Sequence, residues 1–402
     1  MKNKIMISSV LTMALLTTSA FAQKESSLET FLNDITKSGQ LRVGYVNYDF
    51  TGTPSEYSTA IGGHLRFETP IFNDNFTVAI TPYFGASSGS LSGSESEGRY
   101  HTSLSGVNKS YMTLGEAYFG FKKDEISFKI GRQIIDTPLL GNDDMRLTPQ
   151  TFEGIMANYE KENWGIHAGY LTKWQGYDEG LNKGKFDYKF GKLTTDSDGA
   201  LVLGTNFSTT ISEVELNTQA WYYDIDKLAS VGYGDVTFTG AIGENIGYDL
   251  GVQFTSQSEK DASGYDASLY GLMAGLGYGD FYLYTAYAKS SLDAGKMLFN
   301  GLGGTFYYTA GNEWSMGYLD AGENETSTQI GLSYDFLEGL SLSAYHTDFK
   351  TDSSHIKETD IFFSVFTSEK WDAELVYTDI KDKKGNQTGD YTNILFRANY
   401  NF

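Results

Sequence analysis

One stretch of this chain organises the rest: GRQIIDTPLLGNDDMRLTPQTFEG, which runs from Gly131 to Gly154. Alternating apolar residues lead into it over 126–130 and out of it over 152–159, so the stretch joins two β-strands. Between the strands lie two of the five prolines of the protein, together with turn-forming Gly, Asn and Asp residues. The sequence therefore predicts a stiff connection at this point.

This connection also carries charges of both signs. Its acidic residues and prolines are the candidates for a constriction: Asp136, Pro138, Asp143, Asp144 and Pro149. Taken alone, such a segment is typical of a polar surface turn. In a membrane barrel a rigid charged loop can fold inward and narrow the channel, so the interpretation depends on the rest of the chain.

The first 22 residues have the pattern of a secretory signal peptide. Lys2 and Lys4 precede a short apolar run at 5–16, and the Ala-Phe-Ala motif at 20–22 is an A-x-A cleavage site. The run is too short to span a bilayer. Removing the two lysines takes the net charge from −21 to −23. Residues 23–38 repeat apolar side chains at helical spacing and are expected to form a short periplasmic lead-in helix.

Residues 39–402 alternate apolar and polar side chains in pieces of roughly 10 residues, the length of a tilted membrane strand. In the first piece Leu41 and Val43 share one face, and Arg42 and Gly44 share the other. The predicted strands are 39–50, 57–72, 76–86, 110–122, 126–135, 151–160, 164–174, 200–210, 214–225, 230–240, 246–258, 267–278, 281–290, 327–336, 340–350, 359–368, 371–380 and 390–402. This makes eighteen, and an even number lets both chain ends lie on the periplasmic side, although counting alone leaves sixteen open.

The connections between these strands alternate in length. Every second one is tight, as at 123–125 and 338–339, whereas several of the others are long and polar, as at 175–199 and 291–326. Short turns on one side and long loops on the other are typical of outer-membrane barrels. No stretch after the signal peptide holds about 20 unbroken apolar residues, so transmembrane helices are excluded.

The last strand supports a barrel independently. It alternates the apolar residues Ile394, Phe396, Ala398 and Tyr400, and the chain ends on Phe402. An alternating strand that closes on an aromatic residue resembles the signal read by the outer-membrane assembly machinery. A closed barrel is also the β-structure that leaves no unpaired edge in hydrocarbon.

Composition and motifs argue against other classes of protein. The acidic charge and the lack of a basic stripe disfavour nucleic-acid binding. Cysteine is absent, and the five histidines are scattered without metal-ligand spacing. No Gly-x-Ser-x-Gly or His-Glu-x-x-His motif is present, so we expect no enzyme, no cofactor and no metal. A soluble β-sandwich is disfavoured because it would hold fewer tyrosines at strand ends.

Residues 142–154, preceded by Gly-Arg-Gln at 131–133, resemble the signature of the OprD-type outer-membrane porins. Members of that family are eighteen-stranded barrels that pass small, often carboxylated nutrients such as amino acids. They have an inward-folded third extracellular loop and a ladder of basic residues on one wall. The strand count makes 136–150 the third extracellular loop of this chain as well. The resemblance therefore implies an all-β transmembrane antiparallel barrel with this loop folded inward.

The resemblance also assigns a role to Arg146, which matches the motif arginine and so would belong to the basic ladder. Met145 departs from the motif, which usually has a small hydroxyl residue there. The Asp-Thr-Pro start of the loop is shared with the trimeric major porins. For this reason both a monomer and a homotrimer stay open.

Strand parity selects the other candidates for lining the pore. Arg42, Arg66 and Arg397 fall on the inward face of strands that become neighbours when the barrel closes. Arg132 falls on the outward face and needs a bulge at Gly131 to reach the lumen. With the loop arginine and one inward histidine, the candidate pore-lining or substrate residues are Arg42, Arg66, Arg146, Arg397, His64 and Arg132.

The sequence thus predicts an outer-membrane porin for passive diffusion of small hydrophilic nutrients, with carboxylate-bearing solutes such as amino acids preferred. A general-diffusion trimeric porin without selectivity and a surface adhesin barrel are the alternatives. Expected partners are outer-membrane lipid and lipopolysaccharide, the barrel assembly machinery and the solute, after export by the general secretory route. The net charge should give a weak preference for cations, whereas the arginines should decide which solute is recognised.

Overall fold

The computed structural model describes residues 34–72, 75–106, 110–144, 146–175, 197–304, 306–319 and 322–402. The signal peptide expected over 1–22 and most of the lead-in expected over 23–38 lie outside these ranges. Residues 36–38 belong to the first strand, so the barrel begins before the predicted boundary at residue 39.

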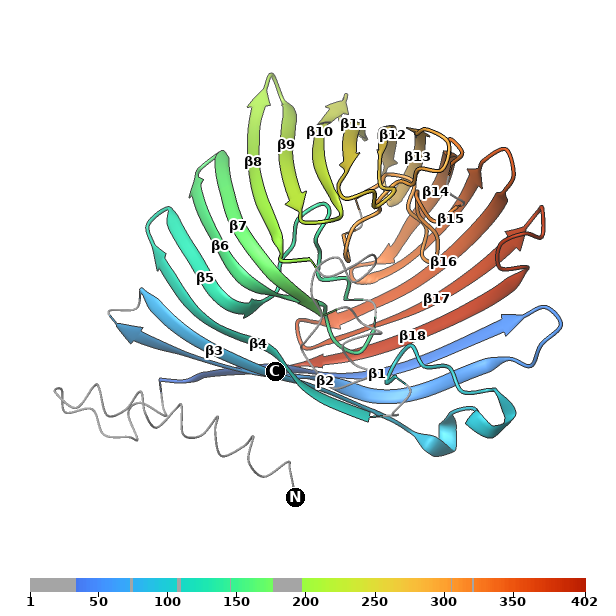
Figure 1. The fold of residues 1–402 in the computed structure, drawn as a ribbon, viewed down its shortest axis with the longest axis horizontal. Coiled ribbons are helices and arrows are strands. Elements are labelled where there is room, and N and C mark those ends of the chain that lie inside the picture. The colour runs from blue at the N-terminus through green and yellow to red at the C-terminus, as the bar shows by residue number, and fades with distance from the viewer. Residues whose placement is uncertain are drawn as a thin grey trace.

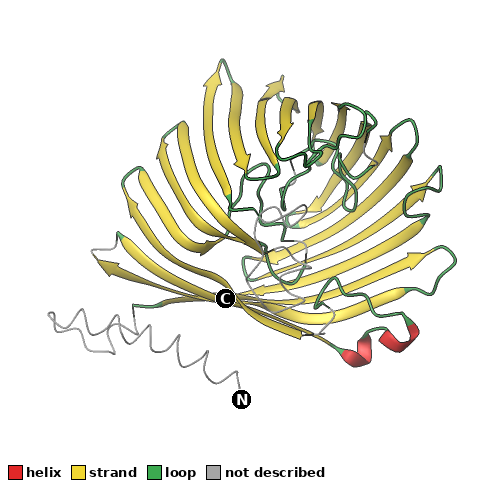
Figure 2. Cartoon of the chain, viewed as in Figure 1, coloured by secondary structure: helices red, strands yellow, loops and turns green. Residues whose placement is uncertain are grey.

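The described chain forms strands joined by turns and loops, with two short 3-10 turns, η1 and η2 (Figures 1 and 2). The first nine strands are β1 Thr36–Phe50, β2 Glu56–Phe72, β3 Phe76–Ser87, β4 Ser110–Lys123, β5 Ile126–Gln133, β6 Thr151–Lys161, β7 Trp164–Gln175, β8 Ala200–Ile211 and β9 Val214–Ile225. The other nine are β10 Ala229–Ile242, β11 Ile246–Glu259, β12 Ala267–Tyr278, β13 Phe281–Ser291, β14 Thr326–Leu337, β15 Leu340–Lys350, β16 His355–Ser368, β17 Trp371–Asp382 and β18 Tyr391–Asn401. The turns η1 (Gly89–Leu91) and η2 (Glu95–Glu97) lie between β3 and β4.

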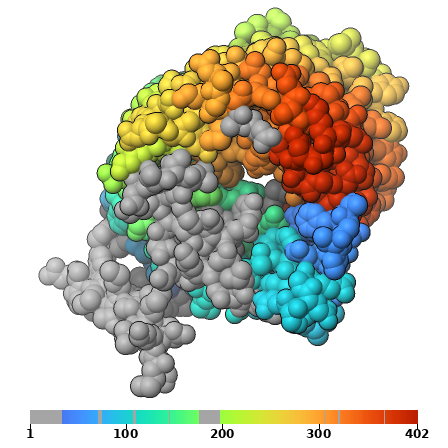
Figure 3. Space-filling view, turned by 45° about the vertical axis from the view of Figure 1, so that its right-hand side comes forward, coloured from blue at the N-terminus to red at the C-terminus, as the bar shows by residue number. Residues whose placement is uncertain are grey.

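The eighteen strands close into one antiparallel barrel, because β1 pairs with both β2 and β18. Gly39 and Phe402 exchange backbone hydrogen bonds of 2.9 and 3.0 Å across this seam. In the space-filling view the N-terminal strands, in blue, lie directly against the C-terminal strands, in red (Figure 3). The predicted fold class and strand number are confirmed.

The barrel carries its apolar side chains on the outside. On β1, Leu41 and Val43 are 43% and 40% exposed, whereas the side chain of Arg42 between them is 3% exposed. This reversal suits a protein whose outer face meets lipid, and it rules out the soluble sandwich. Exposed aromatic residues follow the tight-turn end, as in the girdle of a membrane barrel: Trp164, Tyr278, Phe281, Phe336, Trp371 and Phe402.

The predicted strand ends are close to those observed, with two larger differences. β1 starts at Thr36 rather than residue 39, and β16 starts at His355 rather than residue 359. Among the described residues no helix is long and apolar enough to cross a membrane.

The buried apolar cluster lies inside the barrel and is built largely from two loops. Loop 3 denotes residues 134–150, between β5 and β6, and loop 7 denotes residues 292–325, between β13 and β14. Leu139 and Leu140 of loop 3 are fully buried, as are Phe299 and Leu302 of loop 7 to within a few per cent. The loops accordingly gather within the curve of the strands (Figure 2).

Candidate functional site

Loop 3 is held against the inner wall by contacts along its length. The Leu139 N–H donates to the Tyr223 hydroxyl on β9 at 3.3 Å, and the hydroxyls of Tyr111 and Thr148 are 3.1 Å apart. Leu147 packs over Gly62 of β2, where an added Cβ would lie 3.0 Å from the leucine side chain. A small residue on the wall therefore makes room for the loop.

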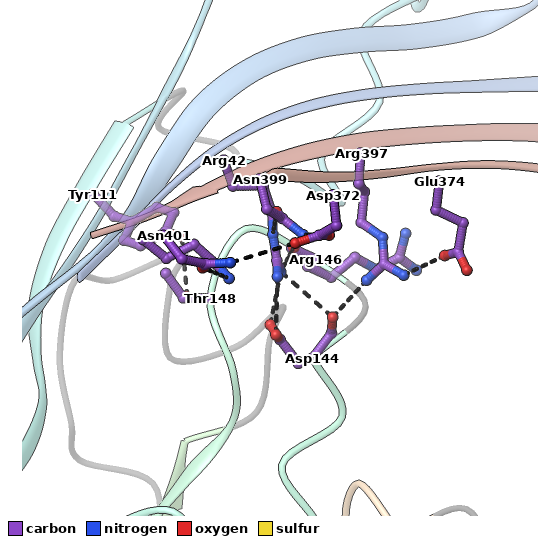
Figure 4. Close-up of polar contacts among 11 residues, drawn as sticks. Arg42, Tyr111, Asp144, Arg146, Thr148, Asp372, Glu374, Arg397, Asn399 and Asn401 are labelled. Carbon is purple, nitrogen blue, oxygen red and sulfur yellow. Dashed lines mark hydrogen bonds and ion pairs between the residues drawn. The ribbon is translucent and has the colours of Figure 1, made fainter. Parts of the chain in front are cut away.

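Two wall arginines converge on Asp144 of loop 3 (Figure 4). Arg42 of β1 binds both carboxylate oxygens at 2.7 and 2.9 Å. Arg397 of β18 donates to the Asp144 carbonyl at 2.6 Å and pairs with Glu374 of β17 at 2.5 Å. Paired guanidinium donors of this kind fix orientation as well as supplying attraction. The loop is thus tied to the wall at the β18–β1 seam.

Arg42 differs from its neighbour in being buried. Besides Asp144, it donates to Asn399 at 2.6 Å and to the carbonyl of Arg146 at 2.6 Å. These contacts engage all three guanidinium nitrogens. Arg42 is therefore an anchor for loop 3, and its prediction as a solute-binding residue is corrected.

Arg146 extends from loop 3 toward the long-loop end of the same wall. It donates to the Tyr48 hydroxyl on β1, and its charge acts on Asp143 and Glu313. Burial, with Arg146 acting in the same direction, lowers the pKa of His101 in the β3–β4 loop to about 4. Burial raises the pKa of Asp143, against the effect of Arg146. The loops therefore surround this guanidinium with acidic and aromatic groups.

Arg66 lies on the same wall but apart from this group. The strand register places Arg66 four residues closer to the tight-turn end than Arg42. It pairs with Glu116 of β4 at 3.1 Å and also with Glu68. The His64 ring lies 5.7 Å from the ring of Tyr83. The three predicted wall arginines thus share one side of the lumen, but Arg66 does not meet the loop.

Arg132 stays on the outward face. β5 runs beside β4 and β6 without a register shift, so the bulge needed to turn this residue inward is absent from these pairings. Its outward neighbour Ile130 is 48% exposed. Arg132 instead pairs with Glu153 at 3.0 Å, and Lys173 joins that carboxylate at 2.7 Å. The prediction that Arg132 lines the pore is corrected.

The sequence did not single out loop 7 as part of the site, yet it binds directly to loop 3. The Gly141 N–H donates to the Leu302 carbonyl at 3.0 Å, and the Leu302 N–H donates to the Leu139 carbonyl at 2.8 Å. A Cβ on Gly304 would lie 2.0 Å from the Pro138 carbonyl oxygen. Glycine is needed there because the two backbones touch. The loops therefore form one unit.

Side-chain amides of β11 hold loop 7 on the opposite wall. Gln253 accepts from the Tyr308 N–H and donates to the Phe306 carbonyl, both at 2.8 Å. Gln257 makes the same pair of contacts with the backbone of Phe299, both at 2.7 Å. A sequence signal for this was present in the apolar residues of a supposedly polar loop, all buried in the structure: Leu298, Phe299, Leu302, Phe306, Tyr307, Trp314 and Met316.

Two cavities follow one another along the lumen. One of about 1110 Å³ is lined by loops 3 and 7 and by side chains of β8–β10, among them Trp221, Tyr233 and Asp235. The other, of about 660 Å³, lies at the tight-turn end and is lined by Glu374 and by turns such as 335–341. Arg397 lines both cavities. It therefore marks the place where one gives way to the other.

The structure places four of the five loop candidates on the larger cavity. The larger cavity is lined by Asp136, Pro138, Asp143 and Asp144, whereas Pro149 is buried behind it. Asp143 also accepts a hydrogen bond from Gln150 at 2.8 Å. The loop thus presents acidic groups to the lumen, opposite Asp235.

The inward loop 3, the narrowed lumen and the arginines on one wall are together typical of one known protein family. The chain matches a family model described as outer membrane porin, OprD family, over residues 29–355. The chain belongs to the OprD family of outer-membrane porins. It is accordingly a membrane channel and not an enzyme or an adhesin.

Solved structures share the barrel of this OprD-family porin. OccK9 (OpdG) of Pseudomonas aeruginosa superposes with a TM-score of 0.76 at 18% identity, over 92% of this chain and 99% of that one. OpdK of the same organism, solved with vanillate, superposes with a TM-score of 0.75 at 18% identity, over 92% of this chain and 99% of that one. OccAB4 of Acinetobacter baumannii superposes with a TM-score of 0.74 at 16% identity, over 92% of this chain and 98% of that one. At such identities the likeness shows the fold alone. Comparison with curated proteins found no match.

One buried loop carboxylate predicts how the stability of this porin depends on pH. Glu325 of loop 7 accepts the Gly317 N–H at 2.8 Å, and burial raises its pKa from 4.5 to about 8. Between those values the folded protein binds more protons than the unfolded chain, so stability falls as pH rises. Glu325→Gln should remove this loss and gain roughly 1–3 kcal/mol at pH 8. Urea unfolding in micelles at pH 5 and pH 8 measures the free energy of unfolding of parent and variant. An equal loss of stability in both proteins between these pH values would contradict the prediction.

Proposed function

We propose that this porin passes small carboxylate-bearing nutrients, amino acids among them, by passive diffusion through a lumen narrowed by loops 3 and 7. One observation carries the proposal: Arg397 lines both cavities, so a solute that moves between them passes this guanidinium. Its side chain is 18% exposed, unlike the buried Arg42.

The chemistry of Arg397 suits a carboxylate. A guanidinium offers five N–H donors, and its contacts with Asp144 and Glu374 use one on each terminal nitrogen. Within the described residues this leaves the Nε–H and one N–H on each terminal nitrogen for a solute. Two such donors match the two oxygens of a carboxylate.

The opposite side of the larger cavity is acidic and aromatic. Asp235 faces it together with Trp221, Tyr233 and Tyr284. A solute with an ammonium group as well as a carboxylate can therefore find an opposite charge on each side, which favours amino acids. The structure of OpdK with vanillate adds support by analogy, because a carboxylate is the ligand of that fold relative.

The rival is general diffusion without selectivity, and solute flux separates the two. Liposome swelling with the purified porin should be faster for a small amino acid or monocarboxylate than for its neutral amide of the same size. We expect a ratio of about tenfold, which corresponds to 1.4 kcal/mol of preference in the constriction. The same carboxylate should block single-channel current at low millimolar or smaller concentrations, roughly the affinity of a few such contacts. Equal rates for acid and amide would establish general diffusion.

A further inference from the structure

The outer face of β13–β17 carries a group of cations at its long-loop end. These five strands are consecutive in the barrel wall (Figure 1). Each lysine within the strands is flanked in sequence by buried residues, so the alternation points it away from the lumen. The outer basic patch denotes these residues: Lys289 of β13, Lys350 of β15, His355 and Lys357 of β16, Lys381 of β17, and Lys383 just after β17. A chain with a net charge of −21 thus gathers five lysines on one part of its outer face.

The strand register brings positive groups opposite one another. Lys357 pairs directly with Lys381 across β16 and β17, and Lys350 pairs with His355 across β15 and β16. Like charges in directly opposite positions destabilise a sheet, because their Cβ atoms lie only about 5 Å apart. An anion bound between two such side chains removes the repulsion. The register therefore favours a bound negative group at this place.

One carboxylate in the patch is shared by several cations. Asp348 lies 3.3 Å from the Lys350 ammonium, 3.5 Å from that of Lys357 and 3.1 Å from the His355 ring. A single negative charge cannot neutralise two lysines. Lys350 and Lys357 are 55% and 36% exposed, so both remain open to a ligand. Asp348 accordingly holds these side chains together and leaves positive charge unspent.

The rest of the patch does not cancel this excess. Lys381 lies 2.9 Å from Asp379 and 3.7 Å from Asp390. Lys289 and Lys383 are exposed, and the Lys383 backbone N–H donates to the His355 carbonyl at 2.9 Å. Five lysines thus face the three carboxylates named here, which leaves an excess of two positive charges.

Lipid-facing apolar side chains lie directly below these cations. Ile361 of β16 and Tyr377 of β17 pair with each other, four residues closer to the tight-turn end than Lys357 and Lys381. Both are exposed, as is Ile330 of β14. Four residues span about 13 Å along a strand. The outer basic patch therefore lies at the border between the apolar band and the long loops, where the headgroups of the outer leaflet are found.

We infer that the outer basic patch binds a phosphorylated glycolipid of the outer leaflet, with its phosphates on the lysines and its acyl chains on the apolar band below. Ammonium groups form charge-assisted hydrogen bonds with phosphate oxygens. Four strand spacings separate β13 from β17, about 19 Å, which suits a headgroup with more than one phosphate. The apolar band favours such an amphiphile over free phosphate. This site lies outside the lumen, so it goes beyond the proposed passage of solutes and does not depend on it.

The test is a titration of the purified porin in nonionic micelles with dye-labelled, deep-rough lipopolysaccharide. The triple variant Lys350→Gln, Lys357→Gln and Lys381→Gln should weaken binding by at least about tenfold, because each lysine near an anionic headgroup adds attraction. Lys357→Gln alone should weaken it by about threefold. Lys260→Gln is the matched control, because it also removes a lysine from the long-loop end, but one that pairs with a single carboxylate, Asp224. The control should bind like the parent.

Two further probes separate a lipid from other anions. Lipopolysaccharide stripped of its phosphates should bind the parent as weakly as the intact lipid binds the triple variant. Millimolar sodium phosphate should displace the lipid no better than KCl of the same ionic strength, which acts by screening alone. Equal binding of the stripped lipid, specific displacement by phosphate, or an equal loss with Lys260→Gln would overturn the inference.

A charge-conserving variant guards against an indirect effect on the barrel. Lys350→Arg, Lys357→Arg and Lys381→Arg together keep the positive charges and should keep binding within about twofold of the parent, since arginine also binds phosphate. Heat-modifiable mobility on gels shows that each variant is folded. If the arginine variant loses binding as the glutamine variant does, the charge of the patch is not what holds the lipid, and the inference fails.

Discussion

Deletion of residues 139–145 is expected to raise single-channel conductance by about two- to threefold, because it removes the part of loop 3 that fills the lumen. This segment carries the buried Leu139 and Leu140 and the Asp144 carboxylate that receives Arg42 and Arg397. Its removal also releases the backbone bonds to loop 7. The barrel itself should stay closed, since its strands pair without help from the loop.

A deletion elsewhere controls for shortening a loop. Residues 384–388 of the β17–β18 loop are mostly exposed, and removing them should leave conductance within the spread of the parent. Planar-bilayer recordings in 1 M KCl provide the measurement. If the loop 3 deletion conducts like the parent, loop 3 does not limit the channel, and the constriction must be sought elsewhere in the lumen.

Replacing Arg146 and Arg397 together by glutamine is expected to abolish the preference for carboxylates over amides, a loss of about tenfold in the flux ratio. Arg397 is the guanidinium at the junction of the two cavities, and Arg146 stands on the loop above it. Two unit charges 4 Å apart interact by about 4 kcal/mol at an effective dielectric near 20, against about 1 kcal/mol in bulk water. The local guanidinium therefore outweighs the screened net charge of the loops.

The double variant should keep most of its conductance for small salts, because glutamine is no larger than arginine. Arg132→Gln serves as the control, since it removes the same charge from the outward face, where Arg132 pairs with Glu153. It should leave the flux ratio unaltered. If the double variant transports carboxylates as selectively as the parent, the arginines of the wall have a structural role only, like that of Arg42.

The sequence by itself determined the barrel. Lipid on one side of a strand and polar groups on the other impose a period of two, and that period can be read from residues such as Leu41, Arg42 and Val43. The predicted strand bounds are less accurate where a strand continues beyond the lipid. β16 begins with His355 and Lys357 on the outward face, and Lys357 is 36% exposed. Apolar alternation ends there although the hydrogen-bonded ladder continues.

Only the tertiary structure decided which of these residues line a cavity. The alternation along the strands places Arg42 and Arg397 on the same face. Arg42 is buried by Asp144 and Asn399, whereas Arg397 lines two cavities. Likewise, no local pattern in loop 7 predicts that Glu313 accepts a hydrogen bond from Tyr48, 265 positions away in the chain. The physical reason is that periodicity records what lies beside a strand, residue by residue. Contacts between loops arise only once the barrel has closed and brought distant segments into one lumen.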